Sequence, residues 1–184
     1  MKNNLNKSLE DSRENLVDKI QKTYGPIDML LEGGQKLQNV IITYNTWGKL
    51  NKNKSNAILI CHALTGDQYA AGINPVTKKE GWWNSIIGPN KILDTNKYFI
   101  ICPNILGGCM GTTGPSSLNK ITHTTYGMSF PIYTIKDMVN MQLKLIDFLK
   151  IEQLFCILGG SMGGMQVLEW ASSYSERVYT AIPI

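Results

Sequence analysis

The sequence predicts an α/β fold in which a mostly parallel sheet is flanked by helices. Three short runs, at residues 57–61, 98–102 and 154–158, are apolar throughout and are bounded by turn residues. Strands that are buried on both faces of a parallel sheet have this composition. Between the second and third runs, apolar residues recur at helical spacing over 132–149. This succession of strand, helix and strand is typical of a doubly wound fold.

The N-terminal part predicts an extension and then a hairpin. Residues 1–24 are charged, with a few apolar residues at loose helical spacing, and Gly25-Pro26 interrupts that pattern. We therefore expect residues 1–27 to form an N-terminal extension. Two extended stretches, 29–31 and 40–47, flank a glycine turn and predict an antiparallel hairpin.

The remaining residues, 28–184, are expected to be part of one domain that is incomplete at its C-terminus. The last run, VYTAIPI, is apolar and has the composition of another strand. It would leave a hydrophobic strand uncovered at the edge of the sheet. We therefore expect the lid and the C-terminal part of the domain to be absent from this chain.

Composition argues against several classes of function. The net charge of +4 comes from 18 Lys and Arg against 14 Asp and Glu, and the lysines are scattered, so nucleic-acid binding is not expected. No apolar stretch has the length of a membrane span, and the N-terminus lacks the apolar centre of a signal peptide. The four cysteines have no metal-ligand spacing, so we expect no metal and a cytoplasmic location.

The strongest functional signal is the sequence GGSMG, which follows the third apolar run. It gives the pattern G-x-S-x-G, with Ser161 between Gly159 and Gly163, and a helical run follows it. A serine on such a tight turn projects its hydroxyl above the sheet. The glycines on either side must lack side chains because strand and helix nearly touch there. Ser161 is therefore the predicted nucleophile of an α/β-hydrolase fold.

A second segment is expected to complete the site. The run at 57–61 leads into His62-Ala63-Leu64-Thr65-Gly66, where an α/β hydrolase places one donor of its oxyanion hole. We expect the backbone N–H groups of Leu64 and Met162 to bind the oxyanion of an acyl intermediate on Ser161.

Four segments resemble one family, the homoserine O-acetyltransferases. They are HALTG at 62–66, PNILGGCMGTTGPSS at 103–117, FPIYTIKDMV at 130–139 and GGSMGGMQ at 159–166. The glycine-rich second segment is the most discriminating, since general esterases do not share it. At Lys136 an arginine would have been expected, which is a mild departure.

The resemblance implies a ping-pong acyltransferase of methionine biosynthesis, which performs the first committed step. The serine takes an acetyl group from acetyl-CoA, and the hydroxyl of L-homoserine then removes it. Acetyl-CoA enters as a substrate, and no cofactor is implied. Members of the family typically form homodimers through a helical lid that is inserted later in the chain.

The rest of the catalytic triad is expected to lie outside this sequence. The order in α/β hydrolases is Ser, then Asp or Glu, then His, but both histidines lie upstream of Ser161. His62 is interpreted as a residue that organises the oxyanion loop, and His123 as a surface residue. We therefore expect a truncated, inactive piece of an enzyme.

Several alternatives stay open. A homoserine O-succinyltransferase or a serine O-acyltransferase would use the same scaffold, and an esterase would pass the acyl group to water. A non-enzymatic function, as a pseudoenzyme or a binding module, is an alternative from a different class of function. Trp82 and Trp83 either shape the acyl or CoA tunnel or pack under a loop; the resemblance places them in a short helix at the entrance.

Overall fold

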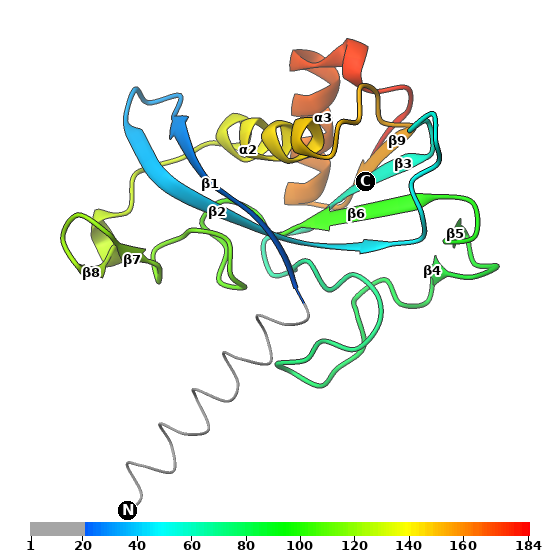
Figure 1. Ribbon diagram of the computed structural model, residues 1–184, viewed down its shortest axis with the longest axis horizontal. Coiled ribbons are helices and arrows are strands. Elements are labelled where there is room, and N and C mark those ends of the chain that lie inside the picture. Colours follow the sequence, from blue (N-terminus) through cyan, green and yellow to red (C-terminus); the bar gives the residue numbers. More distant parts are fainter. Residues whose placement is uncertain (1–20) are drawn as a thin grey trace, which may run out of the picture.

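A computed structural model describes residues 21–184 (Figure 1). The expected N-terminal extension covers residues 1–27, and its first 20 residues lie outside the described part of the chain.

Six strands form one mixed sheet with the order β1-β2-β6-β3-β9-β10. The first two are antiparallel to their neighbours, whereas β6, β3, β9 and β10 run parallel to one another. The mostly parallel sheet predicted from the sequence is therefore confirmed. The bounds are β1 Lys22–Leu30, β2 Lys36–Trp47, β3 Ala57–Cys61, β6 Phe99–Pro103, β9 Cys156–Gly159 and β10 Ala181–Pro183.

The predicted hairpin is present, but its first strand begins earlier than expected. β1 starts at Lys22, which pairs with Tyr44 of β2, so residues 22–27 belong to the sheet rather than to an extension. Gly25-Pro26 lies within β1, where the register shifts between Tyr24 and Ile27. A proline is tolerated on an edge strand at such a bulge, which is why it does not end the strand.

Two helices, α2 (Ile135–Phe148) and α3 (Met162–Ser173), pack against each other on one face of the sheet. α3 lies over β3 and β9, and α2 lies beside it and contacts β1 (Figure 1). Alternate strand residues, among them Leu59, Ile101 and Ile157, point into the core beneath these helices. This is the period of two that a strand imposes on its side chains.

The opposite face of the sheet is covered by irregular chain. Ile58, Ile100 and Leu158 pack there against Ala70 and Ile87, which belong to the long segment between β3 and β6. Within residues 21–184, that face carries no α-helix, so the second helical layer of a doubly wound fold is replaced by turns. Short elements in the connections are β4 Ile87–Gly88, β5 Leu93–Asp94, β7 Leu118–Asn119, β8 Thr124–Thr125, η1 Gly127–Ser129 and η2 Ser175–Arg177.

The sheet order determines where the loops meet. β3 and β9 are adjacent parallel strands, and their last residues, Cys61 and Gly159, are paired across the ladder. The segments that follow them, starting at His62 and Gly160, therefore leave the sheet side by side. The sheet thus brings together the two motifs that the sequence singled out.

Candidate active site

Ser161 occupies the sharp turn between β9 and α3. Its backbone has φ 56° and ψ −125°, a conformation that L-residues rarely adopt. The Ser161 N–H donates to the carbonyl of Ile184 at 2.9 Å, and the residue is exposed. The turn therefore presents the hydroxyl at the carboxyl end of the parallel strands, with the N-terminus of α3 directly behind it.

Two glycines allow this turn to approach β3. A Cβ at Gly163 would lie 2.1 Å from the carbonyl oxygen of Cys61, and a Cβ at Gly159 would lie 2.6 Å from the same atom. Both distances are too short for any side chain. The close approach of strand and helix is thus the physical reason for the two outer glycines of G-x-S-x-G.

The loop after β3 is held in one orientation. The carbonyl oxygen of Ala63 accepts hydrogen bonds from the Gly66 N–H at 2.9 Å and from Nδ1 of His62 at 2.7 Å. Because the peptide is planar and trans, the N–H of Leu64 points opposite to that carbonyl. The direction of the Leu64 N–H is therefore fixed by backbone contacts, while its side chain is 73% exposed.

His62 contacts a second loop with its other ring nitrogen. Nε2 accepts a hydrogen bond from the Ile105 N–H at 3.2 Å, which requires Nδ1 to carry the proton that is donated to Ala63. Burial lowers the pKa of His62, and the side chain is only 1% exposed. Both nitrogens of the neutral ring are thus used to join loops, in keeping with an organising role rather than that of a general base.

A cavity of about 410 Å³ adjoins Ser161. Ala63 and Thr65, the residues on either side of Leu64, line it together with Gly160 and Ser161. Trp82 and Trp83 form another part of the lining. A tetrahedral acyl group on Ser161 would therefore lie between the oxyanion loop and an aromatic wall, an arrangement suited to acyl transfer or ester hydrolysis.

The tryptophans are held by turns and not by the expected short helix. The indole N–H of Trp82 donates to the carbonyl of Asp67 at 3.0 Å, while Trp83 packs against the core beneath the sheet. The Asp67 carboxylate accepts from the Tyr69 N–H at 2.8 Å and from the Asn74 amide at 3.0 Å. Both of its oxygens thus organise this loop.

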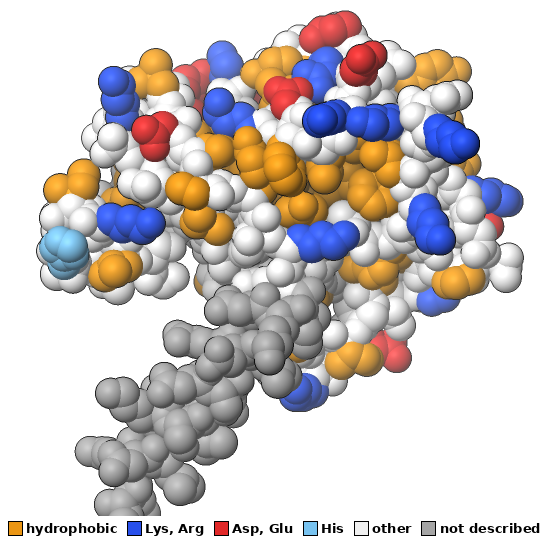
Figure 2. Space-filling model, viewed as in Figure 1, with side chains coloured by type: hydrophobic (Ala, Val, Ile, Leu, Met, Phe, Trp, Pro, Cys, Tyr) orange, Lys and Arg blue, Asp and Glu red, His pale blue; other side chains and the backbone are white. Residues whose placement is uncertain are grey.

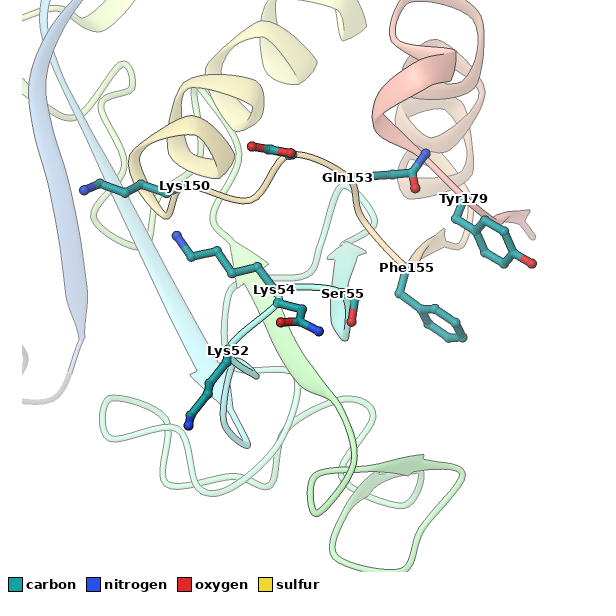
Figure 3. Close-up of a pocket in the computed structure, with 9 residues that line it drawn as sticks. Lys52, Lys54, Ser55, Lys150, Gln153, Phe155 and Tyr179 are labelled. Carbon is teal, nitrogen blue, oxygen red and sulfur yellow. The ribbon is translucent and has the colours of Figure 1, made fainter.

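A larger cavity, of about 780 Å³, lies at the other end of the sheet, before β3, β9 and β10 (Figure 3). It is lined by polar and aromatic residues that include Lys52, Lys150 and Phe155. Figure 3 shows Lys52 extending away from Lys150, so these charges do not converge on one ligand position. The smaller cavity at Ser161 is therefore the candidate site.

The charged residues form no single binding patch on the face shown in Figure 2, where Lys and Arg side chains are spread among acidic and hydrophobic ones. Within residues 21–184, no group of three or more His, Cys, Asp or Glu is placed to hold a metal ion. In the same part of the chain, no helix has both the length and the apolar character to cross a bilayer.

Sequence reasoning missed a buried polar network behind Ser161. Gln142 of α2 and Gln166 of α3 are both 0% exposed and are hydrogen-bonded to each other, and Gln142 also accepts a hydrogen bond from Trp170. A signal was available, because Gln142 falls on the apolar positions of the predicted helix over 132–149. A glutamine at such a position predicts a buried partner, although the identity of that partner depends on how the helices pack.

The fold and this site define a class. The α/β-hydrolase fold family matches residues 56–182, and the chain belongs to that family.

Within the class, the chain is similar to homoserine O-acetyltransferases. It is 60% identical over 154 residues to that enzyme from Mesorhizobium japonicum, a match that covers 84% of this chain and 40% of the relative. It is 54% identical over 175 residues to that from Deferribacter desulfuricans, with 94% and 46% covered. The chain thus spans less than half the length of these relatives.

Two solved structures resemble it closely in backbone. Esterase E22 has a TM-score of 0.82 and 37% identity, with 88% of this chain and 46% of that chain covered. The homoserine O-acetyltransferase from Bacillus anthracis has a TM-score of 0.80 and 37% identity, with 86% and 44% covered. Backbone similarity alone therefore does not distinguish a transferase from a hydrolase.

Proposed function

We propose that this chain carries the nucleophile and oxyanion hole of a homoserine O-acetyltransferase. The observation that supports this most is the 60% identity to such an enzyme over 154 residues. The two solved structures, an esterase and an acetyltransferase, are both 37% identical to this chain and do not favour either activity. The choice of a transferase over an esterase therefore rests on the sequence relatives. In this proposal acetyl-CoA is the donor, L-homoserine is the acceptor and the reaction belongs to methionine biosynthesis.

In the first half-reaction, the Ser161 oxygen forms a bond to the thioester carbonyl carbon. The developing oxyanion accepts hydrogen bonds from the N–H groups of Leu64 and Met162. The C–S bond then breaks, CoA leaves as its thiol and an acetyl-serine remains. In the second half-reaction, the homoserine hydroxyl attacks the same carbonyl, and O-acetylhomoserine leaves with Ser161 restored.

The proton transfers need a base that this sequence does not provide. Its two histidines, His62 and His123, both precede Ser161, and both nitrogens of His62 are already hydrogen-bonded. Since the relatives are more than twice as long, we place the triad His and its acid in the part that this chain does not span. The 184 residues alone are then expected to be inactive, and the homodimer and cytoplasmic location belong to the whole protein.

An esterase is the second candidate, because esterase E22 superimposes as well as the acetyltransferase does. The difference lies in the acceptor of the acyl group. Water would discharge the acetyl-serine of an esterase, whereas homoserine would discharge that of the transferase. A succinyl donor remains a further alternative for the transferase.

The test is mass spectrometry after mixing with acetyl-CoA or succinyl-CoA. It uses the 184-residue chain, a version extended through its downstream coding region, and Ser161→Ala in both. We expect an acetyl adduct on Ser161 in the extended protein, discharged by homoserine. Discharge by water at the same rate with or without homoserine would favour the esterase. Absence of any adduct on Ser161 in the extended protein would refute the nucleophile assignment.

A further inference from the structure

The buried amides behind Ser161 form a chain of hydrogen bonds that runs from α2 to the active-site loops. Trp170 Nε1 donates to Gln142 Oε1 at 2.8 Å, and Gln142 Nε2 donates to Gln166 Oε1 at 2.6 Å. All three side chains are fully buried. Because buried polar groups are costly unless paired, such a network is expected to adopt one arrangement.

The direction of this network is fixed by chemistry. An indole N–H is only a donor, so Gln142 must turn its oxygen toward Trp170 and its nitrogen toward Gln166. Gln166 must then turn its own oxygen toward Gln142. Its two N–H groups consequently point away from the network, toward groups that can only accept.

These two N–H groups reach both halves of the proposed oxyanion hole. Gln166 Nε2 donates to the carbonyl of His62 at 3.3 Å and to the carbonyl of Met162 at 3.2 Å. His62 begins the loop that carries Leu64, and Met162 begins α3. One side chain therefore joins the backbone segments that carry the two N–H donors.

We propose that Gln166 is a positioning residue that sets the spacing between the N–H donors of Leu64 and Met162. The proposal rests on the proposed function, because it assigns those two groups to the oxyanion hole. Gln142 and Trp170 act one step further away, by fixing which way the Gln166 amide faces.

The oxyanion hole is expected to depend on the spacing between the N–H groups of Leu64 and Met162. Hydrogen bonds weaken steeply as their geometry departs from the optimum, and the loop after β3 has no regular structure of its own. The Gln166 amide lies in the interior, where water cannot replace it. Loss of the amide is therefore expected to let the His62 carbonyl and the start of α3 move apart, without removing any group that touches substrate.

Gln166→Met tests the idea by removing both donors while keeping an unbranched side chain of similar length. Gln153→Met is the matched control, because Gln153 Nε2 also donates to a backbone carbonyl, that of Glu176 at 3.1 Å, but at the exposed opposite end of the sheet. Gln142→Met is a second variant that leaves Gln166 in place but without its orienting partner. A cooperative melt establishes that each variant is folded.

The first readout needs no catalysis and uses the 184-residue chain. Amide NMR and hydrogen exchange report on the backbone N–H groups of Leu64 and Met162. We expect both to shift and to exchange faster in Gln166→Met, in the same direction but less in Gln142→Met, and not in Gln153→Met. Unchanged Leu64 and Met162 signals in a folded Gln166→Met would overturn the proposal. If only Gln142→Met folds, its signals decide in the same way.

The second readout distinguishes positioning from a general structural role. It uses the version extended through its downstream coding region, in which Ser161 is acylated by p-nitrophenyl acetate or by its thiono analogue: the Oγ–C bond forms, p-nitrophenolate leaves and the hydroxyl proton passes by way of the base to buffer. Sulfur accepts hydrogen bonds poorly, so an intact oxyanion hole favours the oxygen ester. We expect the oxygen ester to slow by about tenfold or more in Gln166→Met and the thiono ester by much less.

Equal slowing of both esters would make the effect structural and overturn the proposal. If neither ester labels Ser161 in the extended protein without substitutions, the proposed function fails, and the amide signals alone decide whether Gln166 holds the two segments. The two failures are thus distinguishable.

Discussion

The two helices that share one face of the sheet begin in opposite ways. α2 begins with a capping box, in which Thr134 Oγ1 accepts from the Asp137 N–H at 3.3 Å and Asp137 Oδ2 accepts from the Thr134 N–H at 3.0 Å. Asp137 also accepts the N–H of Glu32 at 2.8 Å. α3 begins at Met162, and its N-cap residue, Ser161, has a positive φ and makes no side-chain cap.

The difference lies in which group can bind the free N–H groups at the start of each helix. The first N–H groups of a helix have no partner within it and carry a partial positive charge. At α2, the chain supplies an acidic partner of its own, the buried Asp137, which closes the start. At α3, no side chain among residues 21–184 takes that place, so the start remains available to an anionic group on Ser161.

The largest effect is expected where α3 meets β3. In Gly163→Ala the new methyl group would lie 2.1 Å from a backbone carbonyl, which cannot yield as a side chain can. We expect a loss of more than about 3 kcal/mol of unfolding free energy, measured in urea. Gly160→Ala is the control, since no atom lies within 4 Å of its Cβ, and its stability should change by less than about 0.5 kcal/mol. Similar effects for the two would contradict the close approach.

Removing the cap of α2 is expected to cost less. Asp137→Ala deletes the cap and leaves the N–H of Glu32 without its partner, so we expect a loss of about 2–3 kcal/mol in urea unfolding. Lys144→Ala, on the exposed side of the same helix, should change stability by less than about 0.5 kcal/mol. An Asp137→Ala protein as stable as the parent would show that the capping box is dispensable.

The start of α3 is expected to respond in the opposite direction. Ser161→Gly relieves the strained backbone and should raise the unfolding free energy by about 1 kcal/mol, after the entropic cost of glycine is included. Ser161→Ala keeps the strain and should be nearly neutral. Neither variant can form an acyl adduct. Destabilisation by Ser161→Gly would indicate that the serine hydroxyl supports the fold.

The smallest effect is a pH dependence at the loop that faces α3. Burial lowers the pKa of His62 in the folded state from the ordinary 6.5, so the unfolded chain takes up a proton first as pH falls. The stabilisation from neutral His62 is complete above pH 6.5 and is lost as pH falls through the folded-state pKa. Melting temperatures between pH 7.5 and 5 measure it.

His62→Gln should flatten this dependence, whereas His123→Gln, on an exposed loop, should leave it unchanged. The hydrogen bond to the Ala63 carbonyl and then the charge of Asp67 raise the pKa of His62 against the larger effect of burial. A slope that persists in His62→Gln would assign the dependence to other groups.

Much of the scaffold could be predicted because its signals are local. The three apolar runs became β3, β6 and β9 to within two residues, and the helix expected over 132–149 is α2. The turn at Ser161 followed from the glycine pattern, because its cause is a steric contact that no other residue allows. These elements depend on residues that are close in sequence.

Other features depend on packing between distant segments. Lys22–Leu30 is a strand because β2 offers it an edge, although Gly25-Pro26 predicts an interruption. The hydrogen bonds of Gln166 depend on the positions of His62 and Gln142, which lie 104 and 24 residues away in sequence. Residue pattern alone does not give such distances, so the network behind the site could not be derived.

The strand order also determines when each strand can pair with its neighbours during synthesis. β3 consists only of buried residues and lies between β6 and β9, yet β9 begins about 100 residues later in the chain. At ordinary translation speeds of about 5–20 residues per second, one side of this strand waits roughly 5–20 s for its neighbour. Because β6 also follows β3 in the chain, this fully buried strand is at first unpaired and then half-paired during that interval, when binding by a chaperone would protect it most.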